Sequence, residues 1–144
     1  MKIIKHPDER LKTKCKEVSK INLSVKKEAN ELFLALKSID SPFKIVNGLA
    51  ANQIGLNKRI VILKKTGRFI TMINPEIVSS VIPFLSIEIC ASLPKVIRIK
   101  KRKLIIKVKY LGLDNKIHKI TLFGLSSFTM QQEIGHLNGK LIIN

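Results

Sequence analysis

Apolar residues in the first third of the chain recur at the spacing of a helix. Between positions 22 and 36 they fall on one helical face, at Ala29, Leu32, Phe33 and Leu36. Residues three and four apart are neighbours on a helix, so this pattern predicts a helix from Asn22 to Leu36 that packs on the core. Asn22 or Ser24 is expected to cap its N-terminus. A second helix is predicted near the C-terminus, with Ser126 or Ser127 as its N-cap.

The middle of the chain has the composition and the turn residues of β-strands. Four apolar and β-branched segments are expected to be strands: Arg59–Leu63, Phe69–Ile73, Lys103–Leu111 and Lys116–Phe123. The first two are expected to pair around the turn at Lys64–Gly67, and the last two around Gly112–Asn115. Asn74 and Pro75 are expected to end the second strand. Mostly antiparallel strands between two helices predict a fold of the α+β class.

The chain has the size of one domain. Its 144 residues, 45% of them hydrophobic, suffice for one core. Since no repeat, linker or low-complexity tract divides them, residues 1–144 are expected to form a single domain. No apolar run approaches the roughly 20 residues of a membrane span, and the segment before Pro7 is too short for a secretory signal. We expect a protein of the cytoplasm or an organelle matrix, without a membrane partner, whose Cys15 and Cys90 are free thiols.

The net charge is strongly positive. The chain has 27 Lys and Arg against 10 Asp and Glu, which gives +17. Such a charge attracts anionic partners, so RNA or the ribosome is a candidate partner through the basic surface. The alternative is compositional drift, because the chain is rich in Lys, Ile and Asn, as proteins of AT-biased genomes are. The absence of Trp and an aromatic content of 5% argue against a single-strand binder that stacks bases, and no sequence-specific DNA recognition is expected.

Three short segments carry the residues suited to chemistry. Gly48–Leu56 is made of small residues around Gln53, the one long polar side chain there that can reach inward. Glu88–Pro94 places Cys90 near a carboxylate; taken alone, it favours a buried structural cysteine. If Phe128–Gly139 is a helix, positions 132 and 136 lie on one of its faces, beside Glu133. This is the geometry of a His-Glu-x-x-His metal site, except that Gln132 stands at the first histidine and only His136 remains.

These three segments, in this order, resemble the signature motifs of the peptide deformylases. That family's motifs are usually written Gly-x-Gly-x-Ala-Ala-x-Gln, Glu-Gly-Cys-Leu-Ser and His-Glu-x-x-His. Three further segments are similar to the family as well: Pro7–Leu11, Ile73–Pro75 and His136–Gly139. The resemblance thus runs over nearly the whole chain and implies the peptide deformylase fold.

The resemblance also implies a reaction and a cofactor. Peptide deformylases are metal-dependent hydrolases that remove the formyl group from the N-terminal formyl-methionine of new polypeptides. The partners would be formyl-methionyl nascent peptides, and the cofactor a divalent metal of the Fe, Zn, Ni or Co type. Cys90 and His136 match two of the family's metal ligands, and Gln132 occupies the position of the third.

Further residues match the family's catalytic and binding positions. Glu133 matches the general acid/base. Gln53 and the backbone N–H of Ala91 match the donors that stabilise the oxyanion. The substrate cleft is expected to be lined by a further set of residues: Gly48, Leu49 and Ile89.

Several positions depart from the family's pattern. Gln132 replaces a histidine, Gly135 an aspartate that is common there, Ile89 a glycine and Ala91 a leucine. An amide oxygen is a weak, hard ligand beside a thiolate, so metal occupancy is expected to be weak or absent and the activity impaired. The alternative is an inactive homologue that acts as a peptide- or ribosome/RNA-binding module. The chain ends shortly after Gly139, so we expect it to lack the C-terminal segment with which many bacterial members dock on the ribosome.

Overall fold

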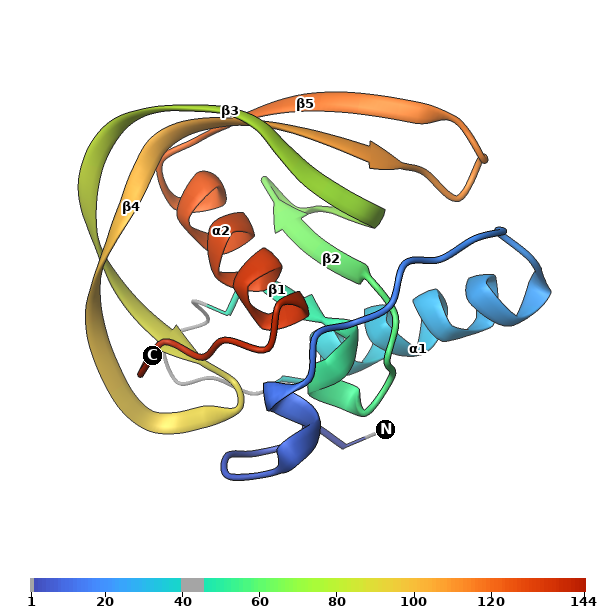
Figure 1. The fold of residues 1–144 in the computed structure, drawn as a ribbon, viewed down its shortest axis with the longest axis horizontal. Helices are drawn as coiled ribbons and strands as arrows, with labels where there is room; N and C mark the ends of the chain where they lie inside the picture. The colour runs from blue at the N-terminus through green and yellow to red at the C-terminus, as the bar shows by residue number, and fades with distance from the viewer. Residues whose placement is uncertain (1, 40–45) are drawn as a thin grey trace.

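The structure is a computed structural model and describes residues 2–39 and 46–144. Its elements, in chain order, are η1 (Glu9–Lys12), α1 (Leu23–Ser38), β1 (Gly48–Ala50), η2 (Ala51–Ile54), β2 (Ile60–Lys65), β3 (Arg68–Cys90), β4 (Leu93–Leu111), β5 (Ile117–Phe123) and α2 (Leu125–Leu137). The described strands form one antiparallel sheet in the order β1-β2-β3-β4-β5. The sheet is strongly curved, and the long strands β3 and β4 bend around α2 (Figure 1). The α+β class is confirmed, and neither described helix is long and apolar enough to cross a membrane.

The helix α1 covers one face of the sheet at β1 and β2. Its buried residues are those at helical spacing: Val25, Ala29, Leu32, Ala35 and Leu36. All of them except Ala29 belong to a cluster that includes Ile60 and Ile62 of β2. The side chain of Asn22 accepts a hydrogen bond from the Val25 N–H at 2.9 Å. The predicted core helix and its Asn22 cap are therefore confirmed, with the helix continuing to Ser38.

The helix α2 packs on the other face, inside the curve of the sheet (Figure 1). Met130 and Leu137 are fully buried there against Val61 and Leu63 of β2 and Leu122 of β5. Since side chains alternate along a strand, Val61 and Leu63 face α2 while Ile60 and Ile62 face α1. This alternation lets one short strand join both helices to the sheet.

The second helix begins near the expected position, but its predicted N-cap is wrong. The helix begins at Leu125 and its N-cap is Gly124, whose φ of 55° is a left-handed conformation that favours glycine. The two expected caps have other partners. Ser126 Oγ donates to the Phe123 carbonyl at 3.0 Å, and Ser127 Oγ donates to the Lys103 carbonyl at 2.8 Å. These hydrogen bonds fasten the first turn of α2 to β4 and β5.

The predicted break at Asn74 and Pro75 is also wrong, because β3 continues through them to Cys90. The register with β4 shifts between Ile73 and Glu76, so this pair occupies a β-bulge. Proline is tolerated at a bulge because no ladder hydrogen bond is required from its nitrogen. The Asn74 side chain exchanges two hydrogen bonds with the backbone of Val18, at 2.9 and 2.8 Å. The partner strand, predicted from Lys103, begins at Leu93, so β3 and β4 form a long hairpin that ends beside α2.

Candidate functional site

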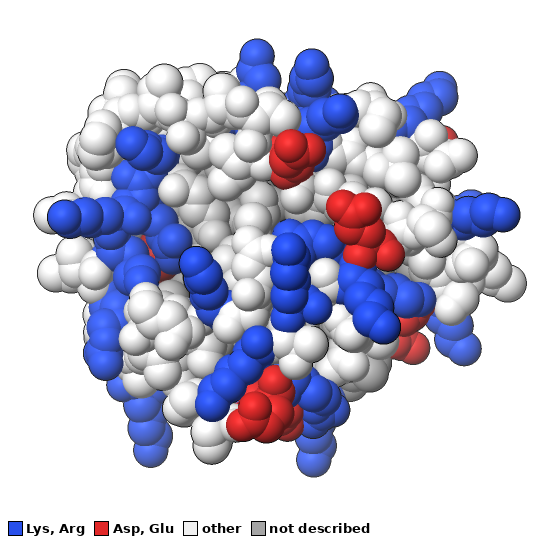
Figure 2. Space-filling view, viewed as in Figure 1, with Lys and Arg blue, Asp and Glu red and all other residues white. Residues whose placement is uncertain are grey.

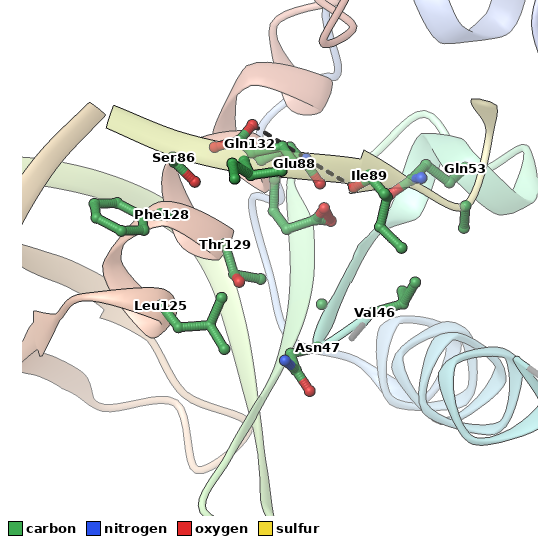
Figure 3. Close-up of a pocket in the computed structure, with 14 residues that line it drawn as sticks. Val46, Asn47, Gln53, Ser86, Glu88, Ile89, Leu125, Phe128, Thr129 and Gln132 are labelled. Atoms are coloured by element: carbon green, nitrogen blue, oxygen red, sulfur yellow. Dashed lines mark hydrogen bonds between the residues drawn. The ribbon is translucent and has the colours of Figure 1, made fainter. Parts of the chain in front are cut away.

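A cleft of about 290 Å³ opens between α2, the end of β3 and the start of β1. All three sequence segments singled out for chemistry contribute to it. From the first come Gly48 and Gln53, from the second Glu88, Ile89 and Ala91, and from the third Thr129, Gln132 and Glu133. Figure 3 shows the side chains of Ile89, Thr129 and Gln132 around this space. The fold thus brings together residues that lie up to 85 positions apart, from Gly48 to Glu133.

Gly48 allows α2 to approach β1 closely. A Cβ atom at this position would lie 2.8 Å from Thr129 Cγ2 and 3.0 Å from Glu133 Cγ. The absence of a side chain at Gly48 is therefore what sets Glu133 against the strand. Leu49, which was expected in the cleft, instead points away from it and is fully buried in the cluster beneath α1.

Cys90 and His136 form a buried pair. Cys90 Sγ lies 3.3 Å from His136 Nε2, and the two side chains are 3% and 0% exposed. Gln53 contacts the cysteine. Its Nε2 donates to Ser92 Oγ at 3.2 Å and lies 3.7 Å from Cys90 Sγ. Its Oε1 accepts from the Ala50 N–H at 3.0 Å, which fixes the amide orientation. The Gln53 N–H groups are therefore directed at the sulfur and at the turn between β3 and β4.

Glu133 completes the buried group. Its Oε1 lies 3.9 Å from His136 Nε2, and its Oε2 has no hydrogen-bond partner among the described residues. Burial raises the pKa of Glu133 from 4.5 to about 8, an effect that nearby Glu88 increases and Arg102 reduces. Without a metal, Glu133 is therefore mostly protonated at neutral pH.

The cysteine and the histidine are also neutral without a metal. Burial, and then the nearby Glu133, raise the pKa of Cys90 from 9.0 to about 12, against hydrogen bonds from Ser92 and Leu93. Burial, and then Arg102, lower the pKa of His136 from 6.5 to about 4. A metal bound here has to displace the thiol proton, so occupancy would depend on pH.

Gln132 takes part in a different set of contacts. Its Nε2 donates to the Ile89 carbonyl at 3.1 Å and to Glu88 Oε1 at 3.3 Å (Figure 3). Glu88, 6% exposed, is held in turn by Arg102, whose Nε and Nη2 donate to its two oxygens at 2.8 and 2.6 Å. This bidentate pair is the strong form of a charged hydrogen bond, so the carboxylate that holds the Gln132 amide is itself firmly placed.

Other residues of the cleft were not anticipated. Leu125 and Thr129 line it from α2, and their spacing of four and then three residues to Gln132 is that of one helix face. From the sequence alone, this spacing could have indicated that Leu125 and Thr129 share a helix face with Gln132. Val46 also lines the cleft, at the position of the first glycine in the Gly-x-Gly motif. Arg102, in contrast, carries no local signal because it reaches Glu88 across the hairpin.

Two of the described side chains are placed as a metal would require, but a third is not. A thiolate and an imidazole that share a tetrahedral ion lie about 3.5 Å apart, and the 3.3 Å between Cys90 and His136 agrees with this. Gln132 instead has its amide nitrogen engaged by Ile89 and Glu88. Within residues 2–39 and 46–144, no group of three or more His, Cys, Asp and Glu is placed to hold a metal ion. The described side chains therefore do not fit the family's complete set of three ligands.

A thiol, an imidazole and a carboxyl group lie together beside a cleft on a curved antiparallel sheet, a set of groups that is typical of a hydrolytic site in an α+β protein. The family model for polypeptide deformylase matches residues 1–144. A peptide deformylase of Thermodesulfovibrio yellowstonii is 36% identical, over 100% of this chain and 87% of its own. The chain belongs to the peptide deformylase family.

Solved structures agree with this assignment. The crystal structure of a peptide deformylase from Legionella pneumophila superposes with a TM-score of 0.90 at 34% identity, covering 99% of this chain and 83% of that one. The peptide deformylase of the Vibrio parahaemolyticus bacteriophage VP16T, solved in complex with actinonin, has a TM-score of 0.89 at 32% identity. It covers 99% of this chain and 100% of that one. The predicted family and its fold are confirmed.

Proposed function

We propose that this protein is a peptide deformylase homologue that still binds formyl-methionyl peptides but whose deformylase activity is impaired. Its metal would be a divalent ion of the Fe, Zn, Ni or Co type, held weakly by Cys90 and His136. Its place of action would be the cytoplasm or an organelle matrix. The observation that carries the proposal is the hydrogen bonding of Gln132 to Glu88 and Ile89, beside a cleft that keeps Gly48, Gln53 and Glu133 of the family's motifs.

The remaining residues are assigned roles that their surroundings support. Glu133 is the group that would move a proton, because its buried carboxyl has a pKa of about 8, near neutral pH. Gln53 and the backbone N–H of Ala91 would donate to the formyl oxygen, since both residues line the cleft beside Cys90. Preorganised donors of this kind stabilise negative charge as it develops, and Gln53 is preorganised by Ala50 and Ser92.

The proposal is tested on the unaltered protein, purified without oxygen and without chelators. We expect elemental analysis to find clearly less than one metal ion per chain. Release of formate from a formyl-Met peptide should be slow and should rise with added Ni²⁺ or Co²⁺, because two ligands hold an ion less tightly than three. One tightly held ion per chain together with rapid deformylation would contradict the proposal.

A second candidate function is a binding module for ribosomal RNA, and the charge of the surface favours it. Figure 2 shows Lys and Arg spread over the visible face and gathered along the side where β4 lies, with Asp and Glu in few places. If this charge is used, binding to RNA should weaken linearly with salt concentration on a log–log plot, measured by filter binding or anisotropy. Absence of binding even at low salt would favour compositional drift.

A further inference from the structure

A second hollow, of about 360 Å³, lies beside the cleft, between the β2–β3 turn and the start of α2. Asn47, Leu125 and Thr129 line both spaces. Figure 3 shows Leu125 and Thr129 on α2 and Asn47 on the opposite side of the cleft. Because they share these walls, the two spaces lie side by side, and together they are called the groove. A peptide whose first residue occupies the cleft can continue into the second hollow.

The two parts of the groove differ in charge. The cleft is lined by the carboxyl groups of Glu88 and Glu133. The described lining of the second hollow contains no Asp or Glu, and its charged residues are Lys64 and Lys65. None of the ion pairs found among the described residues involves Lys65. The hollow is therefore a cationic extension of the cleft.

Strand alternation separates the two lysines. Lys65 follows Leu63 on the face of β2 that packs on α2, so its side chain is on the side of the groove. Lys64 follows Ile62 on the face toward α1, and its Nζ lies 5.8 Å from the centroid of the Phe69 ring. Both lysines line the hollow, but Lys65 is on the strand face toward α2, whereas the Lys64 ammonium group is turned toward the Phe69 ring.

We propose that the second hollow is a subsite for an acidic side chain of the bound peptide, within the few residues that follow the formyl-methionine, and that Lys65 selects it. This inference rests on the proposed function, because it requires formyl-methionyl peptides to occupy the cleft. An extended peptide advances about 3.3 Å per residue, so a side chain two to three residues along reaches roughly 7 to 10 Å from the first. A carboxylate in the hollow would meet the Lys65 ammonium group, which forms no ion pair with the other described residues.

The test measures peptide affinity, so it does not depend on activity. Fluorescence anisotropy is followed for labelled formyl-Met tetrapeptides that carry either Asp or Asn at position two, three or four. At low salt we expect Asp to bind about three- to fivefold more tightly than Asn at one of these positions, as is usual for a partly exposed ion pair. The preference should decline as salt is raised. It should be lost in K65A and kept in K65R.

The matched control is K64A, which removes the same charge from the adjacent residue on the other face of the sheet. It should keep most of the preference for Asp. Equal affinities for the Asp and Asn peptides would overturn the subsite while leaving the cleft as the binding site. If K64A and K65A lose the preference for Asp equally, the specific role of Lys65 is overturned. The preference would then come from the overall positive electrostatic field of the protein. Failure of every formyl peptide to bind would overturn the proposed function itself, and the subsite with it.

Discussion

Replacing Gln132 with histidine is expected to raise the metal affinity of the protein by more than about 100-fold. Loss of a group that only supports a ligand costs about 10- to 100-fold, and Gln132 occupies the position of a ligand itself. The substitution restores two imidazoles four residues apart on α2, one turn of the helix, opposite the Cys90 thiol. Three protein ligands leave one open position for water, as catalytic sites require.

The measurement is metal content after dialysis, followed by deformylation of a formyl-Met peptide. Both should rise in Q132H. The matched control is Q131H, which adds the same imidazole one position earlier, where Gln131 bonds to the backbone of Lys103 on β4. That variant should gain neither metal nor activity, because position 131 is directed toward β4 and not toward Cys90.

A second substitution separates binding of the metal from chemistry. In the Q132H background, E133A should abolish the gain in deformylation while leaving the metal bound, because Glu133 is assigned proton transfer. Occupancy without activity in Q132H would indicate that Ile89, at the edge of the cleft, or Gly135, on α2, is the main defect. No gain in occupancy would refute the assignment of Gln132 as the primary lesion.

The sequence predicted the elements that depend on interactions between residues close together in the chain. The helix α1 was predictable because most of its apolar residues lie on one face and Asn22 can cap only its beginning. The long hairpin was only half predictable. Asn74 and Pro75 have the composition of a break, and only pairing with β4 converts that break into a bulge. Ile87 and Ile99, which pair across the hairpin, are 77% and 67% exposed, while the polar neighbours Ser86 and Glu88 are buried. The usual pattern of apolar residues inside and polar residues outside is therefore reversed there.

The candidate site was predictable where motifs carry it and not where tertiary contacts do. Cys90 and His136 came from the resemblance, and the fold brings them to 3.3 Å. The partners of Gln132 could not be foreseen, because Glu88 lies 44 positions away and becomes its acceptor only when β3 bends around α2. Arg102 places Glu88 for the same reason. The sequence therefore indicated that Gln132 stands where the family has a histidine, but it did not indicate the hydrogen bonds that hold the Gln132 side chain.

The titration of Glu133 gives the metal-free protein a specific dependence of stability on pH. The pKa of Glu133 is raised from 4.5 to about 8 on folding, and that of His136 is lowered from 6.5 to about 4. Stability changes with pH by 2.303RT times the protons bound by the unfolded state minus those bound by the folded state. Between pH 4.5 and 6.5 the unfolded chain holds one proton on His136 and the folded chain one on Glu133, so the two contributions cancel.

Above pH 6.5 the unfolded chain has lost the His136 proton, while the folded chain keeps the Glu133 proton up to about pH 8. The free energy of unfolding should therefore fall by about 1.4 kcal/mol per pH unit, or about 2 kcal/mol in all, between pH 6.5 and 8. Glu133→Gln keeps the shape of the side chain and removes the titration, so this fall should disappear. Urea denaturation of EDTA-treated protein at half-unit steps of pH measures it.

Glu17→Gln is the matched control, because it removes a carboxylate from an exposed position instead of the buried one. It should leave the fall between pH 6.5 and 8 unchanged, since an exposed side chain has nearly the same surroundings in the folded and unfolded chain. If Glu133→Gln and the unaltered protein lose stability in parallel over this range, Glu133 is not protonated in the folded, metal-free state. The role proposed for it in moving a proton near neutral pH would then lose its physical basis, because the group would already be ionised well below that range.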